Sequence, residues 1–185
     1  MTDDREYQPD FGAGEASGPR RSYARKMAGK VTREFSLVGP PVDIGALIAA
    51  RGLRLVLEEV PGALSGQLFP DQHEVFINTH ARSPGRQRFT MAHEFGHWEL
   101  KHYLEEELPP DSQGFEGVYD SASDREGHSP TEVEANTFAA ELLMPGPWVR
   151  QERRPVAPGR AHRLADAYGV SREAMFYQLL HYKML

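Results

Sequence analysis

The sequence predicts an α+β fold in which a small mixed or antiparallel sheet precedes several helices. Between residues 53 and 78, short segments rich in Leu, Val and Ile are separated by Pro and Gly, as expected for strands and turns. After residue 86 the apolar side chains recur at three- and four-residue steps, which is typical of helices. At 185 residues, 39 % of them hydrophobic, the chain is long enough for one domain core with a modest appendage.

Composition limits the functions that this chain can have. The net charge of −6 argues against a protein that coats nucleic acid, because such proteins carry an excess of basic residues. The chain has no cysteine, so a metal would have to be held by His, Asp or Glu. No apolar stretch has the length of a signal peptide or a membrane span, and we therefore expect a cytoplasmic protein without a membrane partner.

The chain divides into three predicted regions. Residues 1–35 mix Gly, Pro, Ser and both charges without an apolar period, which predicts a disordered leader. Its basic run at residues 20–26 could contact a partner or nucleic acid, but a solvated tail is the favoured interpretation. Residues 36–150 are expected to form the main domain, and residues 151–185 a helical hairpin.

The elements follow from local signals. Asp43 is placed to cap a first short helix. Three strands are predicted at 53–60, 65–69 and 73–78, with the last two paired antiparallel. Helices are predicted at 86–103, 129–144, 160–168 and 171–182, the last with Ser171 as its N-cap. The acidic segment at 105–130 is too long for an ordinary connection and is expected to be a lid or locally disordered.

The motif His93-Glu94-Phe95-Gly96-His97 matches H-E-x-x-H. Histidines four residues apart lie one turn apart on the same helix face and can bind one ion. A catalytic zinc needs three protein ligands and an open position for water, and a nearby carboxylate can take the proton of that water. The alternative is two polar histidines on a wet helix face, but apolar and small residues surround the motif, which indicates a buried helix. We therefore predict that His93 and His97 bind a metal and that Glu94 is the catalytic base.

The third ligand is expected from the helix at 129–144. Glu132 and Asn136 share one face of it, so a Glu132 that binds the metal would place Asn136 to hydrogen-bond a ligand histidine from behind. The competing interpretation is that Glu132 belongs to a capping box with Ser129, which would leave Glu134 as the ligand.

Three further residues lie near the motif or in the acidic segment that follows it. His102 lies five residues beyond His97 and is expected to pack or hydrogen-bond rather than to bind the metal. Tyr119 and His128 belong to the acidic segment, where either could stabilise the oxyanion of the scissile carbonyl, but no sequence signal fixes their position.

Two segments, RQRFTMAHEFGH at 86–97 and EVEANTFAAELLMP at 132–145, resemble the ImmA/IrrE family of zinc metallopeptidases. PPVDI at 40–44 and VFIN at 75–78 extend the resemblance, which covers residues 40–150. The resemblance implies a minimal thermolysin-like domain. It also implies that the third zinc ligand is a glutamate four residues before an asparagine, which corresponds to Glu132 and Asn136.

The resemblance also implies a function. Members of the family cleave a helix-turn-helix (XRE-type) transcriptional repressor, which relieves repression of stress-response genes or of a mobile element. We therefore expect a zinc-dependent endopeptidase, with Mn²⁺ as a possible replacement, that makes a specific cut in such a repressor. A strand of the small sheet is expected to pair with an extended substrate segment.

Two alternatives remain open. Residues 164–171, followed by a helix in a basic tail, resemble a helix-turn-helix turn and could indicate a DNA-binding regulator, although an ordinary hairpin packed on the main domain is preferred. The other alternative is a zinc-stabilised interaction module without proteolysis. The presence of Glu94 and of only three good ligand candidates argues against it.

Overall fold

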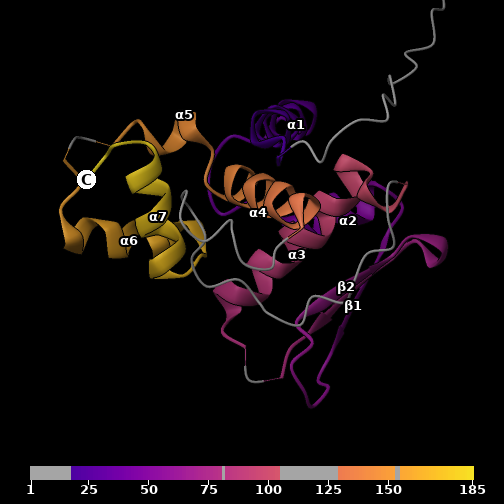
Figure 1. Ribbon diagram of the computed structural model, residues 1–185. Helices are drawn as coiled ribbons and strands as arrows, with labels where there is room; N and C mark the ends of the chain where they lie inside the picture. The colour runs from indigo at the N-terminus through magenta and orange to yellow at the C-terminus, as the bar shows by residue number, and fades with distance from the viewer. Residues whose placement is uncertain (1–17, 81, 105–128, 153–154) are drawn as a thin grey trace, which may run out of the picture.

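The computed structural model describes residues 18–80, 82–104, 129–152 and 155–185. It contains a three-stranded sheet and a set of helices (Figure 1). In chain order the elements are α1 (Arg21–Glu34), α2 (Ile44–Ala50), β1 (Arg54–Glu58), β2 (Gly66–Phe69), β3 (Glu74–Asn78), α3 (Pro84–Leu100), α4 (Pro130–Leu143), α5 (Gly146–Val149), α6 (Pro158–Tyr168) and α7 (Arg172–His181), with short 3₁₀ turns at Pro70–Gln72 and His102–Leu104. The α+β prediction is confirmed.

The sheet is mixed, with strand order β1-β3-β2. β1 runs parallel to β3, and β2 pairs antiparallel with it in the predicted hairpin, with Gly66 opposite Ile77. The connection between β2 and β3 contains the 3₁₀ turn and ends at His73, whose backbone is left-handed. β1 and β2 are therefore the two edges of the sheet.

The central helices α3 and α4 pack against each other, with the sheet on one side and α6 and α7 on the other (Figure 1). α3 contacts β2 and β3, while α4 also packs along α1. The helix starts follow local capping rules, because Asp43 accepts a hydrogen bond from Ala46 N, and Ser83, Ser129 and Ser171 cap α3, α4 and α7 in the same way. The predicted N-caps Asp43 and Ser171 are thus confirmed.

The predicted disordered leader is wrong from residue 21 onward, because α1 is a helix of 14 residues that packs on α4. Its buried positions are Ala24, Ala28 and Val31, spaced by four and three residues. Small side chains carry a weak hydrophobic signal, but they let two helices approach closely. Residues 1–17 of the predicted leader, like most of the acidic segment at 105–130, lie outside the described residues.

The C-terminal hairpin is docked on the main domain. Gln178 on α7 donates a hydrogen bond to Met144 O at 2.9 Å, and the Tyr182 hydroxyl donates to the carboxylate of Glu141. On the α6–α7 turn, Arg88 of α3 donates to Gly169 O. A Cβ at Gly85, near the start of α3, would lie 3.0 Å from the backbone nitrogen of Ser171, so the first residues of α7 lie against α3. In DNA-binding helix-turn-helix proteins this end of the second helix contacts bases, and the packing therefore favours an ordinary hairpin.

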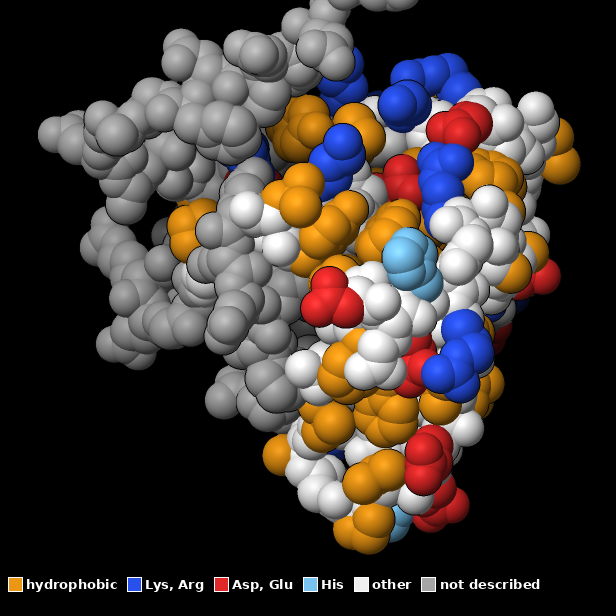
Figure 2. All heavy atoms as spheres, turned by 90° about the vertical axis from the view of Figure 1, so that its right-hand side faces the viewer, with side chains coloured by type: hydrophobic (Ala, Val, Ile, Leu, Met, Phe, Trp, Pro, Cys, Tyr) orange, Lys and Arg blue, Asp and Glu red, His pale blue; other side chains and the backbone are white. Residues whose placement is uncertain are grey.

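The face opposite the hairpin carries basic, acidic and apolar side chains interspersed (Figure 2). Arg51, at the end of α2, pairs with Glu34 and Glu99 at 2.6 Å each, which joins α2 to α1 and α3. Within the described residues, no helix combines the length and apolar character needed to cross a membrane.

Candidate metal centre

The two motif histidines face each other at the centre of α3. Ser83 caps this helix and Pro84 occupies its first turn. His93 and His97 lie in the helix interior, one turn apart because four residues separate them. Their side chains are buried, and their Nε2 atoms lie 3.0 Å apart. Burial of two imidazoles is costly unless each ring nitrogen has a partner, so the surrounding groups determine what this pair can do.

Glu132, in the first turn of α4, brings its carboxylate to both histidines. Its oxygens lie 3.1 Å from His93 Nε2 and 3.2 Å from His97 Nε2. Ser129 caps α4 with its own hydroxyl, which accepts from Glu132 N, so the cap and the contact with the histidines coexist. Glu134 lies on another face, where it contacts Arg20 and His102. The structure thus brings the predicted set His93, His97 and Glu132 together.

The spacing of these atoms fits one metal ion. Zinc binds His nitrogen and carboxylate oxygen at about 2.0–2.2 Å, so ligand atoms at the corners of a tetrahedron lie about 3.3–3.5 Å apart. The three separations here, 3.0, 3.1 and 3.2 Å, are close to that value. Among the described residues, no fourth His, Cys, Asp or Glu joins the cluster. Two histidines and a glutamate are a donor set that zinc uses in catalytic sites.

The outer nitrogens of both histidines are bonded to other side chains. His93 Nδ1 lies 2.8 Å from Asn136 Oδ1, in the contact predicted for Asn136. An amide oxygen can only accept, so His93 carries its proton on Nδ1 and presents the lone pair of Nε2 to the cluster. His97 Nδ1 lies 3.0 Å from His102 Nδ1. Such outer contacts fix the tautomer and the ring orientation of metal-binding histidines.

The protonation states also suit metal binding. Burial lowers the pKa of His97 to about 4, and this ring is neutral at pH 7. Burial opposes the ionisation of Glu132, but hydrogen bonds and charges from His93 and His97 outweigh it and hold the pKa of Glu132 well below its usual range. At neutral pH the cluster therefore contains a neutral His97 and a carboxylate, both able to donate electron pairs.

Glu94 is buried beside the edge strand β2. A Cβ at Gly66 would lie 3.3 Å from Glu94 Oε1 and 2.5 Å from Thr90 Cγ2. The glycine therefore makes room for α3, and the Glu94 carboxylate lies between its helix and this edge of the sheet.

His102 is held behind His97 by a turn of the backbone. α3 ends at Leu100, its C-cap Lys101 has a left-handed φ of 62°, and the following 3₁₀ turn brings His102 back toward the helix. His102 is fully buried and bonds His97 and Glu134, which confirms the expected hydrogen-bonding role. The sequence did not predict the contact of His102 with His97, because it depends on a backbone turn. It also did not predict the ion pair of Glu134 with Arg20, because these residues belong to segments far apart in the sequence. Tyr119 and His128 lie outside the described residues.

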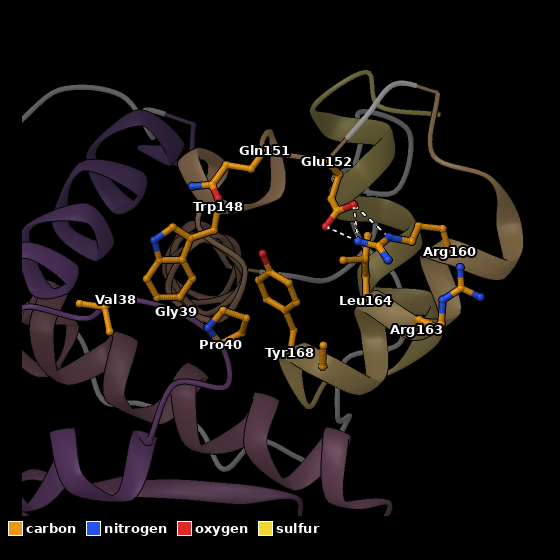
Figure 3. A pocket seen from close by; sticks show the side chains of 11 residues that line it. Val38, Gly39, Pro40, Trp148, Gln151, Glu152, Arg160, Arg163, Leu164 and Tyr168 are labelled. Atoms are coloured by element: carbon orange, nitrogen blue, oxygen red, sulfur yellow. Dashed lines mark hydrogen bonds and ion pairs between the residues drawn. The ribbon is translucent and has the colours of Figure 1, made fainter.

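A separate pocket of about 460 Å³ lies between residues 38–40, α5 and α6 (Figure 3). Trp148 and Tyr168 face each other across it, and the ion pair of Glu152 and Arg160 lies at its edge (Figure 3). None of the residues lining it belongs to the histidine cluster.

Comparisons with known proteins agree with this geometry. Residues 51–180 match the family described as the IrrE N-terminal-like domain, Peptidase M78. The chain is 32 % identical over 161 residues to the radiation response metalloprotease IrrE of Deinococcus radiodurans, an alignment that covers 85 % of this chain and 42 % of that protein. A Mycobacterium tuberculosis transcriptional regulator has a similar fold, with a TM-score of 0.62 at 17 % identity, over 85 % of this chain and 46 % of the other. This chain therefore belongs to the IrrE N-terminal-like family of metallopeptidases.

Proposed function

We propose that this chain is a zinc-dependent endopeptidase. The observation that carries the proposal is the convergence of ligand atoms of His93, His97 and Glu132 at separations of 3.0–3.2 Å, with Glu94 next to His93 on the same helix. The two histidines and Glu132 would hold the ion. A bound Zn²⁺ would lower the pKa of a water molecule and polarise the scissile carbonyl. Mn²⁺ is a possible replacement, because His and carboxylate ligands accept several divalent ions.

In this proposal Glu94 is the general base. Its carboxylate would take a proton from the attacking water and pass it to the leaving amide nitrogen. Glu94 follows His93 directly in α3, so the helix that holds the metal also fixes the base. Glu94 Oε1 would lie 3.3 Å from a Cβ at Gly66, so Glu94 lies next to strand β2.

The substrate is proposed to be an extended protein segment that pairs with β2. One side of β2 is hydrogen-bonded to β3, whereas no strand of the described residues pairs with its other side. An extended peptide can add to such an edge, where main-chain hydrogen bonds give affinity and side-chain pockets give selectivity. Because Gly66 of β2 lies beside Glu94, a segment bound there would pass close to the base.

The biological substrate proposed is a helix-turn-helix repressor of the XRE type, whose cleavage would relieve repression of stress-response genes or of a mobile element. This proposal rests on the family resemblance. The chain spans 42 % of the length of the Deinococcus radiodurans metalloprotease.

The experiment incubates the purified protein with the helix-turn-helix repressors encoded beside its gene, with Zn²⁺, with Mn²⁺ or with a chelator. We expect one discrete cut, located by mass spectrometry, that requires metal. The matched variant is Glu94→Gln, which should keep close to one bound zinc and lose cleavage by at least about 100-fold, the lower range for loss of a general base. Metal-dependent cleavage that persists in Glu94→Gln would overturn the role of Glu94. Zinc binding without any fragment would instead support the non-proteolytic interaction module.

A further inference from the structure

We propose that Arg20, Glu134 and His102 form a chain of hydrogen bonds that positions the metal ligand His97, which makes the start of the N-terminal helix part of the metal centre. The inference rests on the metal site of the proposed function. It assigns positioning roles to three residues outside the metal-binding set.

The chain of hydrogen bonds runs from Arg20 at the surface to the metal ligand His97 without a gap. Arg20 donates hydrogen bonds to the Glu134 carboxylate from its backbone nitrogen at 2.7 Å, from Nε at 3.0 Å and from Nη2 at 3.0 Å. Glu134 Oε2 then lies 3.2 Å from His102 Nε2, and His102 Nδ1 lies 3.0 Å from His97 Nδ1. Glu134 and His102 are 2 % and 0 % exposed, whereas the Arg20 side chain is 44 % exposed.

The direction of the hydrogen bonds follows from the ion pair. Because Glu134 is held as a carboxylate by Arg20, it can only accept, so His102 donates to it from Nε2. When this is the one ring proton of His102, its Nδ1 accepts the Nδ1 proton of His97. That leaves the Nε2 lone pair of His97 directed toward His93 and Glu132. The chain thus selects the tautomer of His97 that can bind a metal.

The two ligand histidines are therefore supported differently. His93 is bonded to the neutral amide of Asn136, on the helix that also carries Glu132. The support of His97 extends through a second histidine to an ion pair with Arg20, which lies directly before α1. The part of the chain that matches the family begins at residue 51 and does not include Arg20.

The test measures Zn²⁺ affinity of the full chain by competition with a chromophoric chelator, and the visible spectrum of the Co²⁺-loaded protein. Loss of an outer hydrogen-bond partner typically weakens metal binding about 10–100-fold. We expect a weakening in this range for Arg20→Gln and His102→Leu, together with a changed Co²⁺ spectrum. The matched control is Arg33→Gln, an exposed arginine at the other end of the same helix, which should bind like the unsubstituted protein.

Two further variants separate positioning from general loss of structure. Glu134→Gln keeps the shape of the side chain and an oxygen that can accept from His102, so it should fold and bind zinc with an intermediate loss. If Arg20 and His102 act through one chain of hydrogen bonds, the double variant Arg20→Gln/His102→Leu should lose little more Zn²⁺ affinity than the more affected single variant. Independent effects of the two substitutions would add.

The possible failures can be told apart. The proposed positioning role would be overturned if the variants had a Zn²⁺ affinity within twofold of the unsubstituted protein, or if the losses added in the double variant. Either result would leave the proposed metal site unaffected. Failure of the unsubstituted protein to bind Zn²⁺ would instead overturn the proposed function, and the positioning role with it.

Discussion

A polar network lies at each end of α4, and the two networks have different roles. At the first end, the outer atoms of His93 and His97 are bonded, but their inner Nε2 atoms converge with Glu132 on one point. At the last end, the side chains of Gln178 and Tyr182 donate to acceptors on and after α4 and hold α7 in place.

The difference shows how the same kind of polar group can serve a site or a fold. In the network at the end of α4, Glu141 accepts from Tyr182 and from Gly146 N at 3.0 Å, so its bonds join protein to protein. In the first network, one carboxylate and two imidazole nitrogens converge on one point, where a bound cation would accept an electron pair from each of them. Substitutions at matched positions of the two networks should therefore change different properties.

The largest expected effect comes from the two glutamates, Glu132 and Glu141, on the same helix. Glu132→Ala should weaken Zn²⁺ binding by more than about 100-fold, because a ligand is lost rather than an outer partner. Glu141→Ala should leave zinc affinity unchanged and lower the free energy of unfolding by about 1–3 kcal/mol, because Tyr182 and Gly146 lose their acceptor. Zinc titration and denaturant unfolding of both variants check this, and a loss of zinc affinity in Glu141→Ala would contradict the separation.

Acidification should affect the metal-free protein next most strongly. Folding lowers the pKa of His97 from 6.5 to about 4, so between these pH values the unfolded chain binds a proton that the folded chain does not. The free energy of unfolding should therefore fall as the pH drops from about 6.5 to 4, by on the order of 3 kcal/mol. Denaturant unfolding in a chelator at pH 7 and pH 4.5 measures it. His97→Gln should show a smaller difference, and an equal difference would argue against His97 as the source.

Gly66→Ala tests the edge strand. The added methyl group would lie 2.5 Å from Thr90 Cγ2 and 3.1 Å from Phe76 O, which should cost about 1–3 kcal/mol of stability through overpacking. Because Thr90 or β2 must shift beside Glu94 to make room for the methyl group, cleavage should fall while Zn²⁺ affinity is kept. The matched control is Gly45→Ala, where the nearest atoms lie at an ordinary 3.5 Å, and cleavage should not change. Equal cleavage by the two variants would argue against substrate binding along β2.

The smallest effect is expected at Gln178. Gln178→Met keeps the length of the side chain but removes the donor to Met144 O, so we expect a loss of about 1–2 kcal/mol with no change in zinc affinity. Leu180→Gln, at a half-exposed position of the same helix, is the control and should lower the free energy of unfolding by less. A zinc affinity that falls in Gln178→Met would mean that the two networks are coupled.

Sequence signals located most of the helices and strands, because capping residues and apolar periods act within a few residues. They failed for α1, where Ala24 and Ala28 are buried although their side chains give little hydrophobic signal. They also left Glu132 and Glu134 both open as ligands, since the two lie in the same helical turn and differ only in what their faces contact.

The sequence by itself determined that two imidazoles and the Glu94 carboxylate share one helix, with the imidazoles on one face of it, because a spacing of four residues is close to one helical turn. Only the tertiary structure decided that Glu132 completes the cluster, that His102 turns back onto His97, and that Arg20 reaches Glu134. These contacts join residues separated by a backbone turn or by up to 114 positions, and no local rule of the chain encodes distances of that kind.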